Sequence, residues 1–106
     1  MLTRPNLIAA VAAALLLAAS HGTAAVPAVE IKDFKYGPAQ LTVAVGSQVT
    51  WTNHDEETHT ITSAAGVFGS AGLGHDETFS QTFTQPGTYP YFCALHPQMR
   101  ATVIVR

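Results

Sequence analysis

Short segments in which apolar and polar side chains alternate fill the chain from residue 26 to its end. Glycine- and proline-containing turns such as Gln85-Pro86-Gly87 separate these segments, and none of them repeats apolar residues at the period of about 3.6 that marks an amphipathic helix. This pattern indicates an all-β sandwich or barrel. About seven strands in so short a region match a small Greek-key β-sandwich of two sheets.

The alternating segments lie at residues 29–34, 41–45, 48–53, 59–62, 78–84, 88–93 and 100–105. The third segment turns Val49 and Trp51 inward, and we expect Trp51, with its large apolar area, to anchor the core. Tyr36-Gly37-Pro38 is typical of a turn. Residues 64–76 hold four glycines and no strong apolar pattern, so we expect a long loop there, with at most a short strand or turn at Val67-Phe68.

The first 25 residues have the layout of a secretory signal peptide. Arg4 supplies a positive charge, an unbroken apolar run extends from Leu7 to Ala19, and small residues follow up to Ala25. The apolar run is 13 residues long, shorter than the roughly 20 that span a bilayer as a helix, which argues against a retained N-terminal anchor. We therefore expect a signal peptide at residues 1–25 and one exported, periplasmic domain at residues 26–106.

Cys93 is the only cysteine of the chain. A single cysteine in an exported protein forms an intermolecular disulfide, stays a free thiol or binds a metal. His96 and Met99 follow it at three-residue spacing, which favours metal binding. One cysteine, two histidines and a weak axial methionine are the ligands of an electron-transfer copper site. Zinc also binds cysteine and histidine, but methionine is a poor ligand for it.

Such a site needs a second histidine, and the candidates after residue 25 are His54, His59 and His75. His59 begins a strand-like segment just after a loop, which would bring it to the same end of a sandwich as the Cys93–Met99 loop. His54 lies in a charged loop and His75 precedes two acidic residues, so both read more simply as solvated histidines. We therefore predict His59, Cys93, His96 and Met99 as the metal ligands.

The chain resembles the cupredoxins, the small blue copper proteins, and among them most the amicyanins. The resemblance rests on the short loop Cys93-Ala94-Leu95-His96-Pro97-Gln98-Met99, on Trp51 and Asn53 followed six residues later by His59, and on Gly87-Thr88-Tyr89 before the cysteine. It covers residues 29–106. It implies a cupredoxin-like fold in which those four ligands bind one type 1 copper that cycles between Cu(I) and Cu(II).

The resemblance also implies roles for residues around the ligands. Asn53 would hold the cysteine loop and help to hydrogen-bond the thiolate, although an ordinary strand-end asparagine is the simpler alternative. Ala94 stands where many relatives have threonine or serine, so one side-chain hydrogen bond between the two ligand loops is lost. Phe92 stands where amicyanins tend to have histidine.

His96 lies in the middle of its loop, so we expect it to be the more exposed histidine ligand. A small apolar patch of Leu95, Pro97 and Phe68 around it would exchange electrons with weakly docked redox partner proteins. The acidic run Asp55-Glu56-Glu57 would either steer a basic partner or form a solvated loop.

The resulting interpretation is a monomeric one-electron carrier, and the alternative from another class is a periplasmic protein that stores or delivers copper. Delivery proteins favour open sites rich in methionine, whereas this chain has two methionines. An enzyme is not expected, because catalysis on this fold needs a further copper and more domains. After position 25 the chain has four basic and seven acidic residues, so it lacks the basic surface that nucleic-acid binding needs. No membrane contact is expected once the signal peptide is removed.

Overall fold

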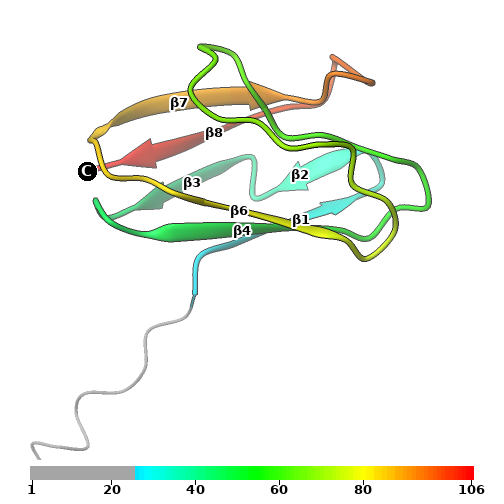
Figure 1. Cartoon of the computed structure of the whole chain (residues 1–106), viewed down its shortest axis with the longest axis horizontal. Helices are drawn as coiled ribbons and strands as arrows, with labels where there is room; N and C mark the ends of the chain where they lie inside the picture. The colour runs from blue at the N-terminus through cyan, green and yellow to red at the C-terminus, as the bar shows by residue number, and fades with distance from the viewer. Residues whose placement is uncertain (1–25) are drawn as a thin grey trace, which may run out of the picture.

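The computed structural model describes residues 26–106, and every named element in this part of the chain is a β-strand (Figure 1). The strands are β1 (Ala28–Lys32), β2 (Lys35–Gly37), β3 (Gln40–Val43), β4 (Gln48–Asn53), β5 (Thr62–Ser63), β6 (Thr78–Thr82), β7 (Gly87–Phe92) and β8 (Arg100–Val105). They form two sheets of four strands, in the orders β2-β1-β4-β6 and β3-β8-β7-β5. The predicted all-β sandwich is confirmed.

The chain crosses between the two sheets several times, so strands that pair are often not consecutive in sequence. β1 pairs in parallel with β4, and β3 pairs in parallel with β8, while the remaining pairs are antiparallel. Alternate side chains of β1, β4 and β8 are buried, as the period of two in a strand requires. The inner faces of the two sheets therefore supply one shared apolar core.

Trp51 lies at the centre of this core and is fully buried, as its place in an alternating segment predicted. Its ring centroid lies 5.6 Å from that of Tyr91 and 5.7 Å from that of Phe79. Phe68 also packs here, 6.3 Å from Trp51 and 5.4 Å from Phe83. The loop that carries Phe68 thus closes one side of the sandwich.

Some predicted boundaries were wrong. Tyr36 and Gly37 belong to β2 instead of forming a turn, and the Gly37-Pro38 bond that follows is cis. β3 ends at Val43, which leaves Val45 exposed. Residues 59–61 form no strand: His59 joins Leu73 through an isolated bridge, and β5 begins only at Thr62.

Three connections meet at one end of the sandwich. They are the turn between β1 and β2, the segment that follows β4, and the loop between β7 and β8, which Figure 1 draws in orange at the end away from the C-terminus. Register explains the meeting, since Ile31 pairs with Asn53, and Phe92 with Arg100, at the last rungs of their sheets. The sequence segments with the predicted ligands therefore leave the sheets side by side.

The predicted signal peptide at residues 1–25 lies outside the described residues. Among residues 26–106 there is no helix with the length and hydropathy needed to cross a bilayer.

The central position of Trp51 gives a test of the core. Trp51→Ala should lower the free energy of unfolding by about 3 to 5 kcal/mol, because it removes a fully buried indole. Trp51→Phe should cost less, since the indole Nε1 has no hydrogen-bond partner among the described residues and its loss breaks no bond. Denaturant unfolding of the metal-free protein measures both, and equal losses would contradict this packing.

Candidate metal centre

One cluster of potential metal-binding side chains lies at the loop end of the described sandwich. It consists of His59, Cys93 and His96, whose donor atoms all lie within 4.8 Å of one another. The sulfur of Cys93 is 3.8 Å from Nδ1 of His59 and 3.7 Å from Nδ1 of His96. Both imidazoles thus direct the same kind of nitrogen toward one sulfur.

The loop between β7 and β8 folds back on itself through its backbone. The His96 N–H donates to the Cys93 carbonyl at 3.2 Å, the Met99 N–H donates to the His96 carbonyl at 2.9 Å, and the Cys93 N–H donates to the Met99 carbonyl at 3.2 Å. These bonds fix the spacing of the three predicted ligands. Met99 is buried at the end of the loop, and His96 is half-buried.

Thr60 ties this loop to the segment that carries His59. Its N–H donates to the Cys93 sulfur at 3.4 Å, and its hydroxyl accepts from the Ala94 N–H at 2.8 Å. The Tyr36 hydroxyl donates to the Thr60 carbonyl at 2.5 Å and so holds Thr60 from the other side. Although Ala94 has no polar side chain, its backbone N–H therefore still links the two segments through Thr60.

Asp55 holds His59 from behind. Its Oδ2 lies 2.9 Å from Nε2 of His59, and its side chain is only 10% exposed. Burial raises the pKa of the Asp55 carboxyl, but the N–H groups of Phe34 and Asp33 and the His59 imidazole outweigh it and lower the pKa below its ordinary value. Asp55 was expected either to steer a basic partner or to lie in a solvated loop, and the structure instead packs it against a predicted ligand.

Phe34 is the aromatic residue that covers the two histidines. Its ring centroid lies 4.9 Å from that of His59 and 4.8 Å from that of His96, edge-on to both. The predicted role of Phe68 in a patch around His96 was wrong, because Phe68 packs against Trp51 in the core. Phe34 had been assigned to a strand, whereas it lies in the turn after β1 with a positive φ of 58°.

Asn53 does not reach the cysteine loop, in contrast to the role that the resemblance implied. Its amide donates to the carbonyls of Glu57 and Leu73, both at 2.8 Å, and its Oδ1 accepts from the Asp55 N–H at 2.9 Å. The fully buried Asn53 therefore shapes the loop that carries Asp55 and His59. Thr60, which no sequence pattern marked, makes the contact to the sulfur instead.

His54 and His75 lie on the surface, as predicted. His54 contacts the Glu30 carboxylate, and His75 lies 3.3 Å from carboxylate oxygens of both Glu56 and Asp76. Neither histidine joins the cluster around Cys93.

The surroundings of Cys93 favour ionisation of its thiol. Burial alone would raise the pKa of its thiol, but the Thr60 N–H, the imidazoles of His59 and His96 and the Leu95 N–H lower the pKa to about 6. The thiolate, which is the form that binds metals, is thus favoured at neutral pH.

The donor set fits copper. One thiolate and two imidazole nitrogens converge within the described residues, and a buried thioether ends the same loop. This combination of soft sulfur and imidazole is the ligand set of blue copper sites. No carboxylate belongs to the described cluster, and that of Asp55 is bonded to the far nitrogen of His59.

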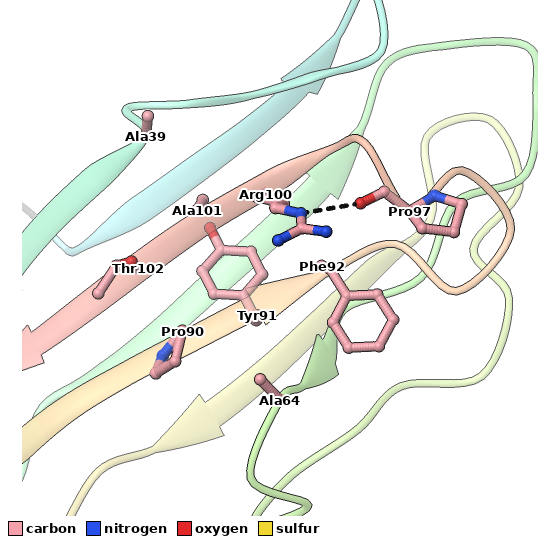
Figure 2. Close-up of a pocket in the computed structure, with 9 residues that line it drawn as sticks. All are labelled: Ala39, Ala64, Pro90, Tyr91, Phe92, Pro97, Arg100, Ala101 and Thr102. Atoms are coloured by element: carbon pink, nitrogen blue, oxygen red, sulfur yellow. Dashed lines mark hydrogen bonds between the residues drawn. The ribbon is translucent and has the colours of Figure 1, made fainter.

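A separate open groove of about 550 Å³ lies beside β7 and β8 and contains none of the clustered side chains (Figure 2). Phe92 and Pro97 line it, together with Arg100, whose Nε donates to the Pro97 carbonyl at 3.2 Å. The groove therefore touches the base of the cysteine loop without opening into the metal centre.

Comparison with known proteins gives matches along nearly the whole chain. A family model described as a cupredoxin-like domain matches residues 7–105. Amicyanin of Paracoccus denitrificans is 42% identical over 82 residues, which are 73% of this chain and 63% of that protein. Amicyanin-alpha of Methylorubrum extorquens is 35% identical over 103 residues, which are 92% of this chain and 86% of that protein.

Solved structures of similar shape include copper proteins. A reduced Cu(I) form of an amicyanin mutant superimposes with a TM-score of 0.74 at 34% identity, covering 83% of this chain and 89% of the other. A copper-containing nitrite reductase from Thermus scotoductus superimposes with a TM-score of 0.71 at 28% identity, covering 76% of this chain and 22% of the other.

The bond from Ala94 to Thr60 can be tested by an isosteric change. Thr60→Val should lower the free energy of unfolding by about 0.5–1.5 kcal/mol, because it removes the hydroxyl that accepts from the Ala94 N–H. Thr60→Ser keeps that acceptor and should lose less. Denaturant unfolding of the metal-free variants measures the difference, and a Thr60→Ser variant as unstable as Thr60→Val would contradict the assignment.

The Cys93 thiol should titrate in the metal-free protein with a pKa of about 6. Ultraviolet absorbance of the thiolate should therefore rise as pH increases through that value and should already be near its maximum at neutral pH. Cys93→Ser supplies the baseline. A midpoint near the ordinary thiol value of about 8.5 would show that the surrounding donors do not stabilise the thiolate.

Proposed function

This chain belongs to the family of cupredoxin-like domains, and from that premise we propose that it is a small copper protein that carries single electrons between partner proteins. The observation that supports this most is the convergence of two Nδ1 atoms on one buried sulfur, at 3.7 and 3.8 Å. The amicyanin relatives and the Cu(I) form among the similar structures support the same cofactor, one type 1 copper ion.

We assign the ligands as Nδ1 of His59, Sγ of Cys93, Nδ1 of His96 and the thioether of Met99. Copper bound there supplies a one-electron Cu(I)/Cu(II) couple. A carrier works best if its ligands need not move when that couple changes state. Three sets of hydrogen bonds restrain the ligands without involving a metal. They are the backbone bonds within the cysteine loop, the bond from Thr60 to Cys93 and the bond between Asp55 and His59.

Electron exchange with partners is proposed at the His96 side. His59 and Cys93 have no exposed surface, whereas His96 is half-buried. Leu95 and Phe34 are 55% and 37% exposed, and Pro97 is also exposed, so an apolar rim surrounds the His96 edge. A small rim of this kind suits the weak, brief contacts of redox encounters.

Export is proposed from the sequence. Residues 1–25 would act as a cleaved signal peptide, and the domain at residues 26–106 would work in the periplasm as a monomer. Of the acidic run, Glu56 has a side chain 83% exposed and, with the exposed Glu57, remains available to attract a basic partner. Asp55 is excluded from that role by its bonds to His59 and the backbone.

Storage or delivery of copper is not favoured by the geometry. Rapid release of a metal requires access to its ligands, and three of the four proposed ligands are 3% exposed or less. An enzymatic role would need a substrate site at the metal, and none of the four proposed ligands lines the groove in Figure 2.

The cofactor assignment has a direct optical test. The protein loaded with Cu(II) should show an intense visible charge-transfer band from the thiolate, which bleaches on one-electron reduction and returns on oxidation with the copper retained. Cys93→Ser should abolish the band. A band that survives in Cys93→Ser, or copper lost on each reduction, would overturn the proposal.

The exchange surface can be tested with a matched pair of surface variants. Leu95→Asp should slow electron self-exchange by at least about tenfold, because two copies must then bring like charges together at the exchange surface. Val67→Asp places the same charge at a similarly exposed apolar residue, 57% against 55%, which lines a separate groove that no residue of the cysteine loop lines. Equal rates for the two variants would contradict exchange at His96.

A further inference from the structure

The Asp55 carboxylate accepts three hydrogen bonds from two different segments. Oδ2 accepts from Nε2 of His59 at 2.9 Å and from the Phe34 N–H at 2.9 Å, and Oδ1 accepts from the Asp33 N–H at 2.8 Å. The side chain is 10% exposed. A carboxylate with this many charge-assisted bonds is held firmly in place.

The first consequence concerns the His59 ring. A neutral imidazole carries one N–H, and the carboxylate at Nε2 places that hydrogen there. Nδ1 is then left with a free lone pair, and it is this atom that lies 3.8 Å from the Cys93 sulfur. A carboxylate bonded to the outer nitrogen of a histidine ligand fixes its tautomer and makes the inner nitrogen more basic.

The second consequence concerns the Phe34 ring. Asp33 and Phe34 both adopt positive φ angles, 54° and 58°, a conformation that residues with side chains rarely take. The Asp55 carboxylate accepts a hydrogen bond from the N–H of each residue, and these bonds stabilise the strained turn. That turn brings the Phe34 ring edge-on to both His59 and His96.

From these contacts we propose that Asp55 is a positioning residue, which sets the orientation and tautomer of His59 and holds Phe34 over the metal centre, and so lowers the reduction potential. This rests on the proposed function as a copper carrier. The negative charge one imidazole away from the metal stabilises Cu(II) more than Cu(I), because the attraction scales with the charge of the ion.

Asp55→Asn tests the charge while keeping the shape. Cu(II) affinity should fall, by the roughly 10- to 100-fold typical for such partners of metal ligands, and it should fall about tenfold more than Cu(I) affinity. For a one-electron couple, a tenfold change corresponds to a rise of about 59 mV in reduction potential. Voltammetry and competition with a Cu(II) chelator measure the two quantities.

Glu56→Gln is the matched control, because it removes the same charge from the adjacent residue, which is 83% exposed and contacts His75 instead of a proposed ligand. Its potential should stay close to that of the parent. Equal shifts of the reduction potential in Asp55→Asn and Glu56→Gln would show that only the net charge of the protein matters, and would overturn the proposal. An unchanged potential in Asp55→Asn would also overturn it.

A readout without copper separates this proposal from the proposed function. In the metal-free parent, nitrogen NMR of His59 should show the hydrogen on Nε2, and hydrogen exchange at the Asp33 and Phe34 amides should be slow. Asp55→Ala should speed that exchange, and Asp55→Asn supplies the same comparison if the alanine variant does not fold. Unaltered exchange in the variants, or a hydrogen on Nδ1 in the parent, contradicts the role of Asp55 even if copper binding is normal.

If the parent instead shows the expected tautomer and exchange but no thiolate band with Cu(II), the copper function fails while the orienting contacts stand. The influence on reduction potential would then be overturned together with that function.

Discussion

The hydrogen bonds of Thr60 are the interaction on which the rest of the metal centre depends. They join the segment that follows β4 in one sheet to the loop between β7 and β8 in the other, across 33 or 34 residues of sequence. Because the Thr60 N–H reaches the Cys93 sulfur itself, the same contact closes the sandwich and stabilises the thiolate. The contact that stabilises the thiolate therefore also links the two sheets.

A buried thiolate and a buried imidazole are costly in an apolar core unless each polar atom has a partner. The end of the sandwich meets this requirement in layers. Thr60 and the loop backbone donate hydrogen bonds to Cys93, and Asp55 accepts one from His59. Asn53 in turn bonds a carbonyl and an N–H of the loop that carries Asp55. The outermost side, at His96, is left to an apolar rim and is the proposed route for electrons.

The sequence was sufficient for the fold class and for the loop that carries Cys93, His96 and Met99, because strand alternation and three-residue ligand spacing are local patterns. It did not identify Thr60 or Phe34 as neighbours of the site, or Asp55 as the bonded partner of His59. Their roles depend on how three connections meet in space, and on a turn with positive φ angles that no local pattern announced. One sign was available, since Asp55 precedes His59 by four residues in the same loop, but its charged neighbours made it resemble a solvated acid. Phe68 was misplaced for the opposite reason, because an aromatic residue in a glycine-rich loop can return to the core.

The central claim is that the folded chain holds the ligand atoms in place before any metal arrives. Crystal structures of the metal-free, Cu(I) and Cu(II) forms test this most directly. The account predicts that in all three forms Nδ1 of His59 and Nδ1 of His96 face the Cys93 sulfur, at distances close to the 3.8 and 3.7 Å described here, with Asp55 on the far side of His59. A His59 or His96 ring that rotates or moves away from Cys93 in any one form would contradict it.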